Sequence, residues 1–526
     1  MNGPAMDDRL NISGQPGGRN SAPIPDPCGD TASVAALPPY DVIIGLEVHV
    51  QLLTQSKLFC RCSTQFGVPP NTQTCPVCTG MPGSLPVMNR EAFQLSLKAA
   101  LALNCEISAF TKWDRKQYYY PDLPKAYQIS QYDLPLSRNG YMEISDTKGA
   151  FATKRVGIIR AHLEEDAGKS MHDEAAGKAD SRIDLNRAGT PLLEIVSQPD
   201  MRSPQEAKAY LTELKLLLSY LGVSDCNMQE GSLRVDANIN LHVHTPEGKV
   251  PTPLVEVKNM NSFRAVERAL ALEAQRQYLA WQETGVRMGA PGGHKTTRGW
   301  DDQAQVTYPQ RQKEESSDYR YFPDPDLAPV TVAPDDVARL REMLGELPAA
   351  IRQRLETTYG IEPYDSDVIV NQGRPLVAYY EELARAIGDG RRASNWVQQD
   401  VLRTLNDRGI GVEQFPVSAA ALAELLAAVQ RGELDGSRAK NVFDHMVAAG
   451  CSAAEALKAL GIQQLDPSEV VELCRRLLAA NPKTVAEVKG GKEKAIGALI
   501  GQAKKLNPNA NPNQVRETCL KLIAEM

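Results

Sequence analysis

Apolar and polar side chains alternate over residues 46–51, in a segment that is rich in β-branched residues. Because successive side chains of a strand point to opposite faces, this alternation predicts a β-strand with one apolar face. The opposite face carries Glu47, His49 and Gln51. A carboxylate and an imidazole two positions apart form half of a divalent-metal site or an acid/base pair, unless the face is simply solvated.

Strand-like segments and turns rich in Gly and Pro continue over residues 40–332, where few segments have a helical pattern. Residues 235–244 and 253–258 repeat the alternation that is typical of strands. Residues 203–206, Ser-Pro-Gln-Glu, form a capping box with proline at the first helical position, and they predict the start of a helix. The whole region is therefore predicted to be an α+β domain with a mainly antiparallel sheet.

The pattern changes after about residue 335, where strand-like alternation stops. Residues 418–430 and 468–480 are rich in Ala and Leu, with apolar residues at helical spacing. We therefore expect an all-α domain over residues 333–450, followed by a C-terminal helical tail over residues 451–526. Residues 1–39 are rich in Gly, Pro, Ser, Asn and Asp, and their composition predicts a disordered extension.

The net charge of −7, from 58 basic and 65 acidic residues, excludes a general nucleic-acid coat protein. One basic segment stands out, because residues 482–505 contain six lysines and two glutamates. This segment is either a solvated helical face or a grip on an RNA backbone. No apolar run is long enough to cross a bilayer and no signal peptide is recognisable, so we expect a soluble, cytoplasmic protein without a membrane partner.

Ten cysteines are too few and too unevenly spaced for a disulfide framework in a chain of 526 residues. Four of them form two close pairs, Cys60 with Cys62 and Cys75 with Cys78. Two short chelating turns with this spacing can supply four thiolates to a tetrahedral ion. Because four thiolates leave no open coordination position, the pattern predicts a structural Zn²⁺ rather than a catalytic one.

Three consecutive carboxylates, Glu164, Glu165 and Asp166, follow an apolar segment. Carboxylate oxygens are suitable ligands for a hard cation such as Mg²⁺, although a charged turn would have the same composition. Other short segments combine lysines with tyrosines and amides, which suit a phosphate and a nucleotide. Lys116, Lys125 and the segment around Lys258 are of this kind.

Five longer segments resemble the signature segments of the B subunits of aspartyl/glutamyl-tRNA(Asn/Gln) amidotransferases, the GatB/GatE family. The resemblance extends from about Tyr40 to the C-terminus. The matching segments are residues 45–49, 120–131, 164–169, 184–194 and 318–326.

This resemblance implies a ligase that forms a carbon–nitrogen bond, with ATP and Mg²⁺ as cofactors and glutamine as amido donor. A chain of this family would phosphorylate the side-chain carboxylate of misacylated Glu-tRNA(Gln) or Asp-tRNA(Asn), and ammonia would then displace the phosphate. An acyl phosphate is needed because oxide is a poor leaving group, so the protein must position the reactants and offset phosphoryl charge. The family also implies a heterotrimer with two partners, a glutaminase (the A subunit) and a small bridging protein (the C subunit).

The resemblance also implies two groups of site residues in a cradle domain, residues 40–332. The implied Mg²⁺ ligands are Glu47, His49 and Glu165, with Glu164 close by. The implied residues of the reaction centre and ammonia entry are Lys116, Lys125, Asp236 and Lys258. The cysteine quartet matches a zinc knuckle that many but not all family members have, which supports a structural role.

One segment departs from the family pattern, because residues 307–314 differ from the usual Met-Arg-Ser-Lys-Glu. The chain also has no amidase-type or cysteine glutaminase motif, so its ammonia must come from a partner. Two rival functions remain at this point. The first is a tRNA-binding scaffold whose chemistry lies on another protein of the complex, and the second is a free-standing amide ligase for a small acid.

Overall fold

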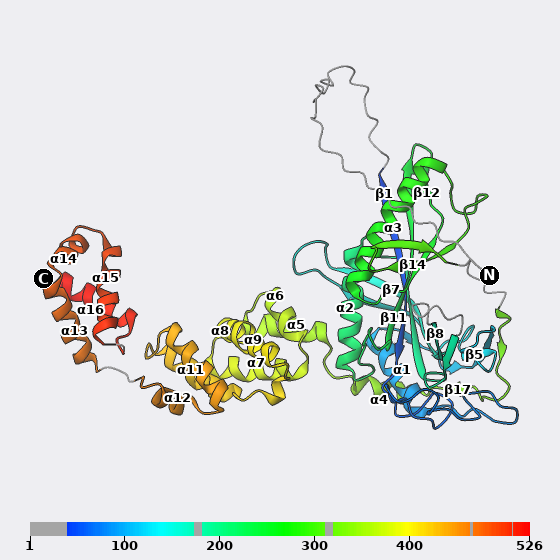
Figure 1. Ribbon diagram of the computed structural model, residues 1–526, viewed down its shortest axis with the longest axis horizontal. Coiled ribbons are helices and arrows are strands. Elements are labelled where there is room, and N and C mark those ends of the chain that lie inside the picture. The colour runs from blue at the N-terminus through cyan, green and yellow to red at the C-terminus, as the bar shows by residue number, and fades with distance from the viewer. Residues whose placement is uncertain (1–38, 173–180, 311–318, 463–465, 508) are drawn as a thin grey trace, which may run out of the picture.

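The computed structural model describes residues 39–172, 181–310, 319–462, 466–507 and 509–526. Three bodies follow one another along the chain (Figure 1), each with its own apolar core. We call them the sheet body, residues 39–347, the helical body, residues 348–462, and the tail body, residues 466–526. Most of the predicted disordered extension, residues 1–38, lies outside the described residues.

A ten-stranded sheet forms the centre of the sheet body, in the order β15-β14-β13-β11-β1-β10-β7-β6-β2, with β12 paired to β11. The pairing of β13 with β14 is parallel, whereas β1 is antiparallel to both of its neighbours. The strands are β1 (Tyr40–Gln51), β2 (Glu106–Ile107), β6 (Ser137–Ile144), β7 (Lys154–Glu165), β10 (Pro191–Ser197), β11 (Leu233–Thr245), β12 (Gly248–Pro251), β13 (Val255–Lys258), β14 (Thr296–Asp301) and β15 (Val306–Pro309).

Three small sheets accompany the large one. In the first, β4 (Asp114–Gln117) lies between β16 (Phe322–Pro323) and β5 (Tyr127–Ser130). The second pairs β3 (Phe110–Thr111) with β17 (Val330–Thr331), and the third pairs β8 (Lys169–His172) with β9 (Ser181–Asp184).

One face of the large sheet is apolar, as the alternation of β1 predicts. Val48 and Val50 are fully buried there, in a core shared with α1 (Arg90–Ala102), α2 (Pro204–Tyr220) and α3 (Phe263–Thr284). Figure 1 shows α2 and α3 beside the sheet. Burial of these aliphatic side chains removes apolar area from water and fixes the register of β1. The opposite face is thereby left to the polar residues of β1.

The N-terminus of α2 confirms most of the predicted capping. The Ser203 side chain accepts a hydrogen bond from the backbone N–H of Glu206, and Pro204 is the first helical residue. The Glu206 carboxylate, however, accepts from the backbone N–H of Arg202 rather than from that of the cap residue. Each bond satisfies a backbone donor at the helix start, so the cap is effective although it differs from the standard box.

Beyond α4 (Pro334–Glu342), which packs near α1, the described chain consists of helices. This confirms the predicted fold class, an antiparallel-rich α+β body followed by helical bodies. The helical body contains α5 (Pro348–Tyr359), α6 (Pro363–Val370), α7 (Arg374–Ile387), α8 (Gly390–Trp396), a π-helical turn (Val397–Val401), α9 (Leu402–Arg408), α10 (Ala419–Gln430), α11 (Gly436–Ala449) and α12 (Ala453–Ala459). The tail body contains α13 (Pro467–Ala480), α14 (Pro482–Lys489), α15 (Ile496–Leu506) and α16 (Pro512–Glu525). Among the described residues, no helix combines the length and apolarity that a membrane crossing requires.

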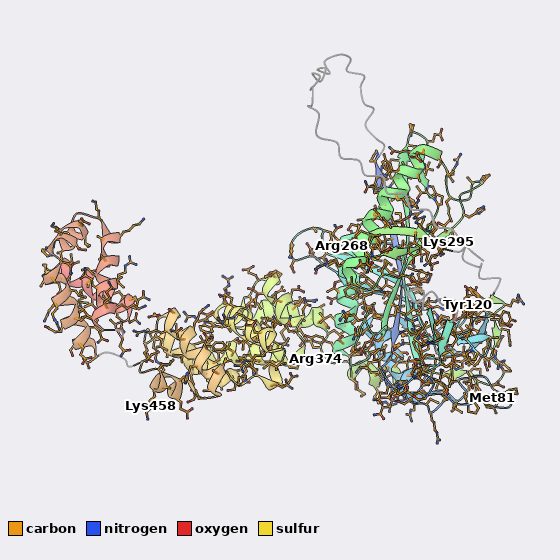
Figure 2. All side chains as sticks on the ribbon, viewed as in Figure 1. Met81, Tyr120, Arg268, Lys295, Arg374 and Lys458 are labelled. Carbon is orange, nitrogen blue, oxygen red and sulfur yellow. The ribbon has the colours of Figure 1, made fainter. Side chains whose placement is uncertain are left out.

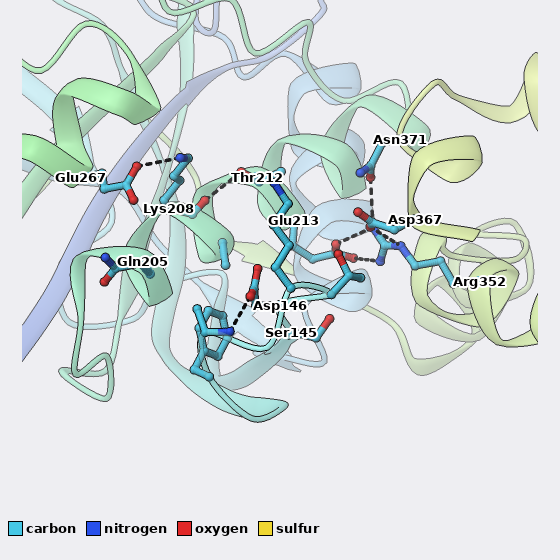
Figure 3. A pocket seen from close by; sticks show the side chains of 15 residues that line it. Ser145, Asp146, Gln205, Lys208, Thr212, Glu213, Glu267, Arg352, Asp367 and Asn371 are labelled. Carbon is cyan, nitrogen blue, oxygen red and sulfur yellow. Dashed lines mark hydrogen bonds and ion pairs between the residues drawn. The ribbon is translucent and has the colours of Figure 1, made fainter. Parts of the chain in front are cut away.

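A polar cavity of about 400 Å³ lies where α2 meets the helical body (Figure 3). Arg352 of α5 crosses this junction: its Nη2 lies 2.9 Å from Glu213 Oε2 of α2, and its Nε lies 3.0 Å from Asp367 Oδ1 of α6. Arg374, labelled in Figure 2, places its guanidinium over the Tyr220 ring, 5.1 Å from the ring centroid. These contacts join the helical body to α2 through charged groups.

Candidate active site

The polar face of the sheet carries a row of charged side chains that runs across four strands. His49 of β1 is paired with Glu194 of β10, and Glu194 is paired in turn with His162 of β7. On the other side of β1, His49 is paired with Arg234 of β11. Residues that are directly opposite on paired strands have close Cβ atoms, so the strand register alone gathers these side chains.

Glu194 is the centre of the first acidic cluster. Its Oε2 lies 3.2 Å from His162 Nε2 and 3.6 Å from His49 Nε2. Glu164, two residues after His162, places its Oε1 3.8 Å from the same His49 nitrogen. One ligand atom from each of His49, Glu164 and Glu194 lies within 4.8 Å of the others, which is a grouping able to hold a metal ion. We call these three residues the primary cluster.

The charges of this cluster control the protonation of His49. Burial by itself lowers the pKa of His49, but the hydrogen bond to Glu194 and the negative charges of Glu194, Glu164 and Asp236 raise it to about 9. Burial raises the pKa of Glu194, yet the two histidines hold it well below its usual range. Without a metal the imidazole therefore carries a proton at neutral pH, and a bound cation would have to displace it.

A second acidic cluster lies on the same face, one row further along β1. It consists of Glu47, Asp236 and Glu256, whose ligand atoms also lie within 4.8 Å of one another. Asn238 Nδ2 donates to Glu47 Oε1 at 2.9 Å. The Lys258 ammonium pairs with Asp236 and lies 3.4 Å from Glu256 Oε1. This secondary cluster is therefore already partly neutralised by the lysine that was expected in the same pocket.

Glu165 lies apart from the primary cluster, although Glu164 precedes it. Neighbouring residues of β7 point to opposite faces, and Glu165 pairs with the Lys125 ammonium. Its Oε1 also accepts the backbone N–H of Ile129 at 2.8 Å. The buried Glu165 thus holds the end of the Lys125 side chain against β5.

Asp166, the third consecutive acid, turns back to the polar face and pairs with cations. Its Oδ2 lies 2.6 Å from Arg234 Nη2 and 3.6 Å from Arg187 Nε, and it accepts from Gln51 Nε2 at 2.8 Å. Burial raises the pKa of Asp166, but the two guanidinium groups lower it below its usual value. Asp166 thus orients two arginines beside the primary cluster.

These arginines border a cleft of about 650 Å³. The cleft is lined by Gln51, Arg187 and Arg234 from the site, by Lys169 of β8, and by residues 64–68 of the cysteine-containing loop. Guanidinium and ammonium groups at the edge of a cleft are suited to bind phosphate oxygens.

Tyrosines surround Lys116 of β4. The Lys116 ammonium lies 5.8 Å from the ring centroid of Tyr118 and 5.0 Å from that of Tyr319. Tyr132 and Tyr321 stack nearby, with their ring centroids 4.0 Å apart. Burial lowers the pKa of Lys116, but the charges of acidic residues across the site raise it, and Glu164 contributes most. The lysine is therefore a positive charge held beside the acidic cluster.

The four cysteines of the knuckle meet in the sheet body, although 12 residues separate the two pairs. The sulfur atoms of Cys60, Cys62, Cys75 and Cys78 all lie within 4.8 Å of one another. The backbone N–H of Cys75 donates to Cys78 Sγ at 3.2 Å. The hydrogen bond with Cys60 lowers the pKa of Cys78, and the charge of Lys57 contributes to the same shift. Four soft donors in this arrangement fit tetrahedral Zn²⁺.

The structure brings together most of the residues expected at the site, but in two clusters. His49 and Glu164 belong to the primary cluster, Glu47 and Asp236 belong to the secondary cluster, and Glu165 belongs to neither. Sequence reasoning assigned no role to Glu194 or Glu256. The sequences of β10 and β13 did carry a signal for these two residues, because Glu194 and Glu256 each stand between two apolar residues of their strand. Of the segment that departs from the family pattern, residues 307–309 belong to β15, whereas residues 311–314 lie outside the described residues.

Two family models match this chain. The GatB/GatE catalytic domain matches residues 42–338, and the GatB domain matches residues 378–523. The first covers most of the sheet body with both acidic clusters, and the second covers most of the helical body and the tail body.

Individual relatives give the same result over nearly the full chain. A protein of Rhodopirellula baltica is 60% identical over 488 residues, which is 93% of this chain and 98% of the relative. Proteins of Moorella thermoacetica and Carboxydothermus hydrogenoformans are 47% and 45% identical, over 91% and 93% of this chain and 98% and 99% of theirs. All three are named as B subunits of aspartyl/glutamyl-tRNA(Asn/Gln) amidotransferase. With matches of this extent and a polar sheet face that falls within the catalytic-domain match, the chain belongs to the GatB/GatE family.

Proposed function

We propose that this chain is the kinase and transfer subunit of an ATP-dependent tRNA amidotransferase. Its substrate would be Glu-tRNA(Gln), Asp-tRNA(Asn) or both, with glutamine as the amido donor. The observation that carries this proposal is the primary cluster, in which two carboxylates and an imidazole from three neighbouring strands meet on one sheet face. The names of the relatives supply the reaction class.

The donor set of the site fits Mg²⁺. Glu164 and Glu194 offer carboxylate oxygens and His49 offers one nitrogen, while water and substrate oxygens would complete the coordination. In the secondary cluster, Asn238 Oδ1 is buried and has no hydrogen-bond partner among the described residues, so an oxygen donor remains beside Glu47. A bound Mg²⁺ would supply charge neutralisation for the phosphoryl oxygens of ATP.

The cationic side chains would complete the reaction centre. Arg234 and Arg187 are held by Asp166 at the edge of the cleft, where they would bind phosphate oxygens. Lys116 would offset charge on the transferring phosphoryl group, because it stays protonated beside Glu164. Lys125, held by Glu165, would line the route by which ammonia reaches the activated carboxylate.

Lys258 would take part through the secondary cluster. It neutralises Asp236 while no cation is bound there. A cation at Glu47 and Asp236 would release this ammonium, which could then contact substrate. The lysine would thus be either a substitute for a cation or a substrate ligand.

The four-cysteine centre would hold a structural Zn²⁺. All four sulfur atoms would be ligands, so no position would be open to substrate. Its role would be to fix the loop of residues 60–78 at the border of the cleft.

The tail body would bind the outer part of the tRNA. The lysines of residues 482–505, which belong to this body, are exposed, as an electrostatic contact with phosphates requires. They are Lys483, Lys489, Lys492, Lys494, Lys504 and Lys505. We further propose a cytoplasmic heterotrimer, in which a glutaminase, the A subunit, is the ammonia source and a small C subunit is the third member.

The experiment that tests this proposal supplies ammonia directly. The protein, co-expressed with the A and C subunits, is mixed with Glu-tRNA(Gln), Mg-ATP and ammonium chloride without glutamine, and Gln-tRNA(Gln) is measured. Wild type, Glu47→Ala and His49→Ala are compared, together with their tRNA affinities. The proposal expects product from wild type only, with tRNA binding retained by both variants.

Equal product from all three proteins would mean that the chemistry lies on a partner protein, and the scaffold function would replace the proposed one. A small-acid amide ligase is disfavoured by the basic tail body, which a small substrate does not require. If free glutamate replaced Glu-tRNA(Gln) as a substrate in the same assay, that second rival would be supported instead.

A further inference from the structure

Lys57 is a buried lysine whose charge the reaction described above does not use. Its side chain has no exposed surface and lies beside the cysteine centre. The ammonium donates to the backbone carbonyls of Gln73 at 2.7 Å and Leu185 at 3.3 Å, and lies 3.6 Å from Cys78 Sγ. Within the described part of the chain, no carboxylate forms an ion pair with it.

A buried ammonium is stable only where negative charge or several acceptors compensate for its lost hydration. Two carbonyl oxygens supply partial compensation for Lys57. The neighbouring group that can carry a full negative charge is the Cys78 sulfur. Four thiolates around a divalent ion leave a net charge of about −2. A lysine at this position would therefore offset part of the net charge of about −2 of a filled centre, whereas the metal-free centre would carry less negative charge for it to offset.

We propose that Lys57 is the counter-cation of the four-cysteine centre and couples this centre to the loop of residues 185–190 in the reaction site. This inference rests on the zinc site of the proposed function. Zinc then makes the burial of Lys57 favourable, and Lys57 in turn makes the thiolates better zinc ligands. Lys57 is thus a positioning residue that does not touch substrate.

The coupling path is short and consists of backbone hydrogen bonds. Beside the bond from Lys57 to Leu185, the N–H of Leu58 donates to the Gly189 carbonyl at 2.8 Å. The Gly189 N–H donates in turn to the Asp166 carbonyl at 2.8 Å. Asp166 is the acid that holds Arg187 and Arg234 at the cleft. A shift of the cysteine loop would therefore be transmitted to these arginines.

Glycine packing shows how closely the centre and the site approach. A Cβ atom on Gly189, which has φ +85°, would lie 3.5 Å from Cys78 Cβ and 3.7 Å from Glu165 Oε2. On the other side of the knuckle, a Cβ atom on Gly80 would lie 2.5 Å from Lys125 Cγ. The turn after Cys78 thus packs directly on the aliphatic part of Lys125, with no room for a side chain between them.

The test compares wild type with a Lys57 variant, each with zinc bound and after zinc removal. The full chain is used, co-expressed with its partner proteins. Lys57→Met removes the charge but keeps much of the aliphatic volume. Lys98→Met is the matched control, because the Lys98 ammonium also donates to a backbone carbonyl, that of Leu221 at 2.6 Å, but belongs to α1. Zinc content, the rate of zinc transfer to a chromogenic chelator and the melting temperature are measured with zinc and after its removal.

We expect Lys57→Met to lose zinc to the chelator about 10 to 100 times more readily than wild type, since changes next to metal ligands commonly weaken metal binding to this extent. Its melting temperature should lie below that of wild type with zinc, and the difference should shrink or reverse without zinc. Lys98→Met should retain zinc as wild type does and shift the melting temperature equally in both states.

An equal loss of melting temperature with and without zinc, at unchanged zinc transfer, would overturn the inference, because Lys57 would then act through its carbonyl bonds alone. If wild type itself binds no zinc, the zinc proposal and this inference both fail, whereas activity with ammonium chloride still tests the reaction separately. If Lys57→Met does not fold, Lys57→Gln, which keeps a hydrogen-bond donor without the charge, is subjected to the same comparison with the same expected outcome.

Discussion

His49 and Glu194 face each other across β1 and β10, with Nε2 and Oε2 3.6 Å apart. They are 145 positions apart in the sequence, and only the antiparallel register makes them partners. Glu194 also contacts His162 on the next strand, so it links three strands on the polar face. A cation site at this place depends on Glu194 as much as on His49.

Glu194→Gln should weaken divalent-cation binding by a factor of about 10 to 100, because it removes one of the two carboxylates of the primary cluster. Mn²⁺ titration followed by electron paramagnetic resonance measures this directly. Glu143→Gln is the control, since Glu143 forms an exposed ion pair with Arg155 on β6 and β7. Equal Mn²⁺ affinity for both variants would place the cation elsewhere.

Lys125 and Glu165 form a buried pair, with 7% and 3% of their side chains exposed. Lys125→Met should destabilise the sheet body by about 3–5 kcal/mol, because it leaves an unpaired buried carboxylate. The double variant with Glu165→Gln should recover much of this loss. Calorimetric unfolding of both variants checks the expectation, and additive losses would show that the two residues do not depend on each other.

Removal of zinc should lower the stability of the sheet body, and should affect the helical body only through the junction between them. The centre joins two segments of the loop, and its loss should reduce the melting temperature of this body by several degrees. Cys62→Ser should behave like chelator treatment of wild type. Cys451→Ser is the comparison, because Cys451 packs against the helical body away from the centre. Unchanged melting after complete metal removal would argue against a structural role.

Arg352→Met should uncouple the sheet and helical bodies. The substitution leaves Glu213 and Asp367 without their shared cation at a partly buried junction, at a cost of about 3–5 kcal/mol. Calorimetry should then show two separated transitions, and proteases should cleave near residue 347 sooner. Arg391→Met removes an exposed pair with Glu362 and should change stability by less than about 1 kcal/mol. One unchanged transition in Arg352→Met would contradict the coupling.

Short-range sequence patterns predicted the strands, helices and cysteine group whose formation depends mainly on residues close together in the sequence. The alternation of β1 required only one buried face, and the periodicity of α10 and α13 required only a helix with an apolar side. The cysteine spacing likewise predicted a close group of four sulfur atoms, because two short turns leave little freedom to the ligands.

The composition of the acidic clusters depends on strand register, which the sequence alone does not display. Glu164 and Glu165 are neighbours, so the pleat of β7 sends them to opposite faces, and only Glu164 reaches His49. Glu194 and Glu256 come from distant strands, and their place beside β1 and β11 follows from sheet order. Family resemblance located the segments, but it did not by itself give the pairing.

The proposed function requires that ATP is cleaved on the polar face of this sheet. The most direct measurement is single-turnover formation of ADP from Mg-ATP, triggered by Glu-tRNA(Gln), in the complex without an ammonia source. We expect rapid ADP formation with wild type and Glu143→Gln, and a rate lower by about 100-fold or more with Glu194→Gln, at unchanged tRNA binding. ADP formation by Glu194→Gln at the wild-type rate would contradict the claim.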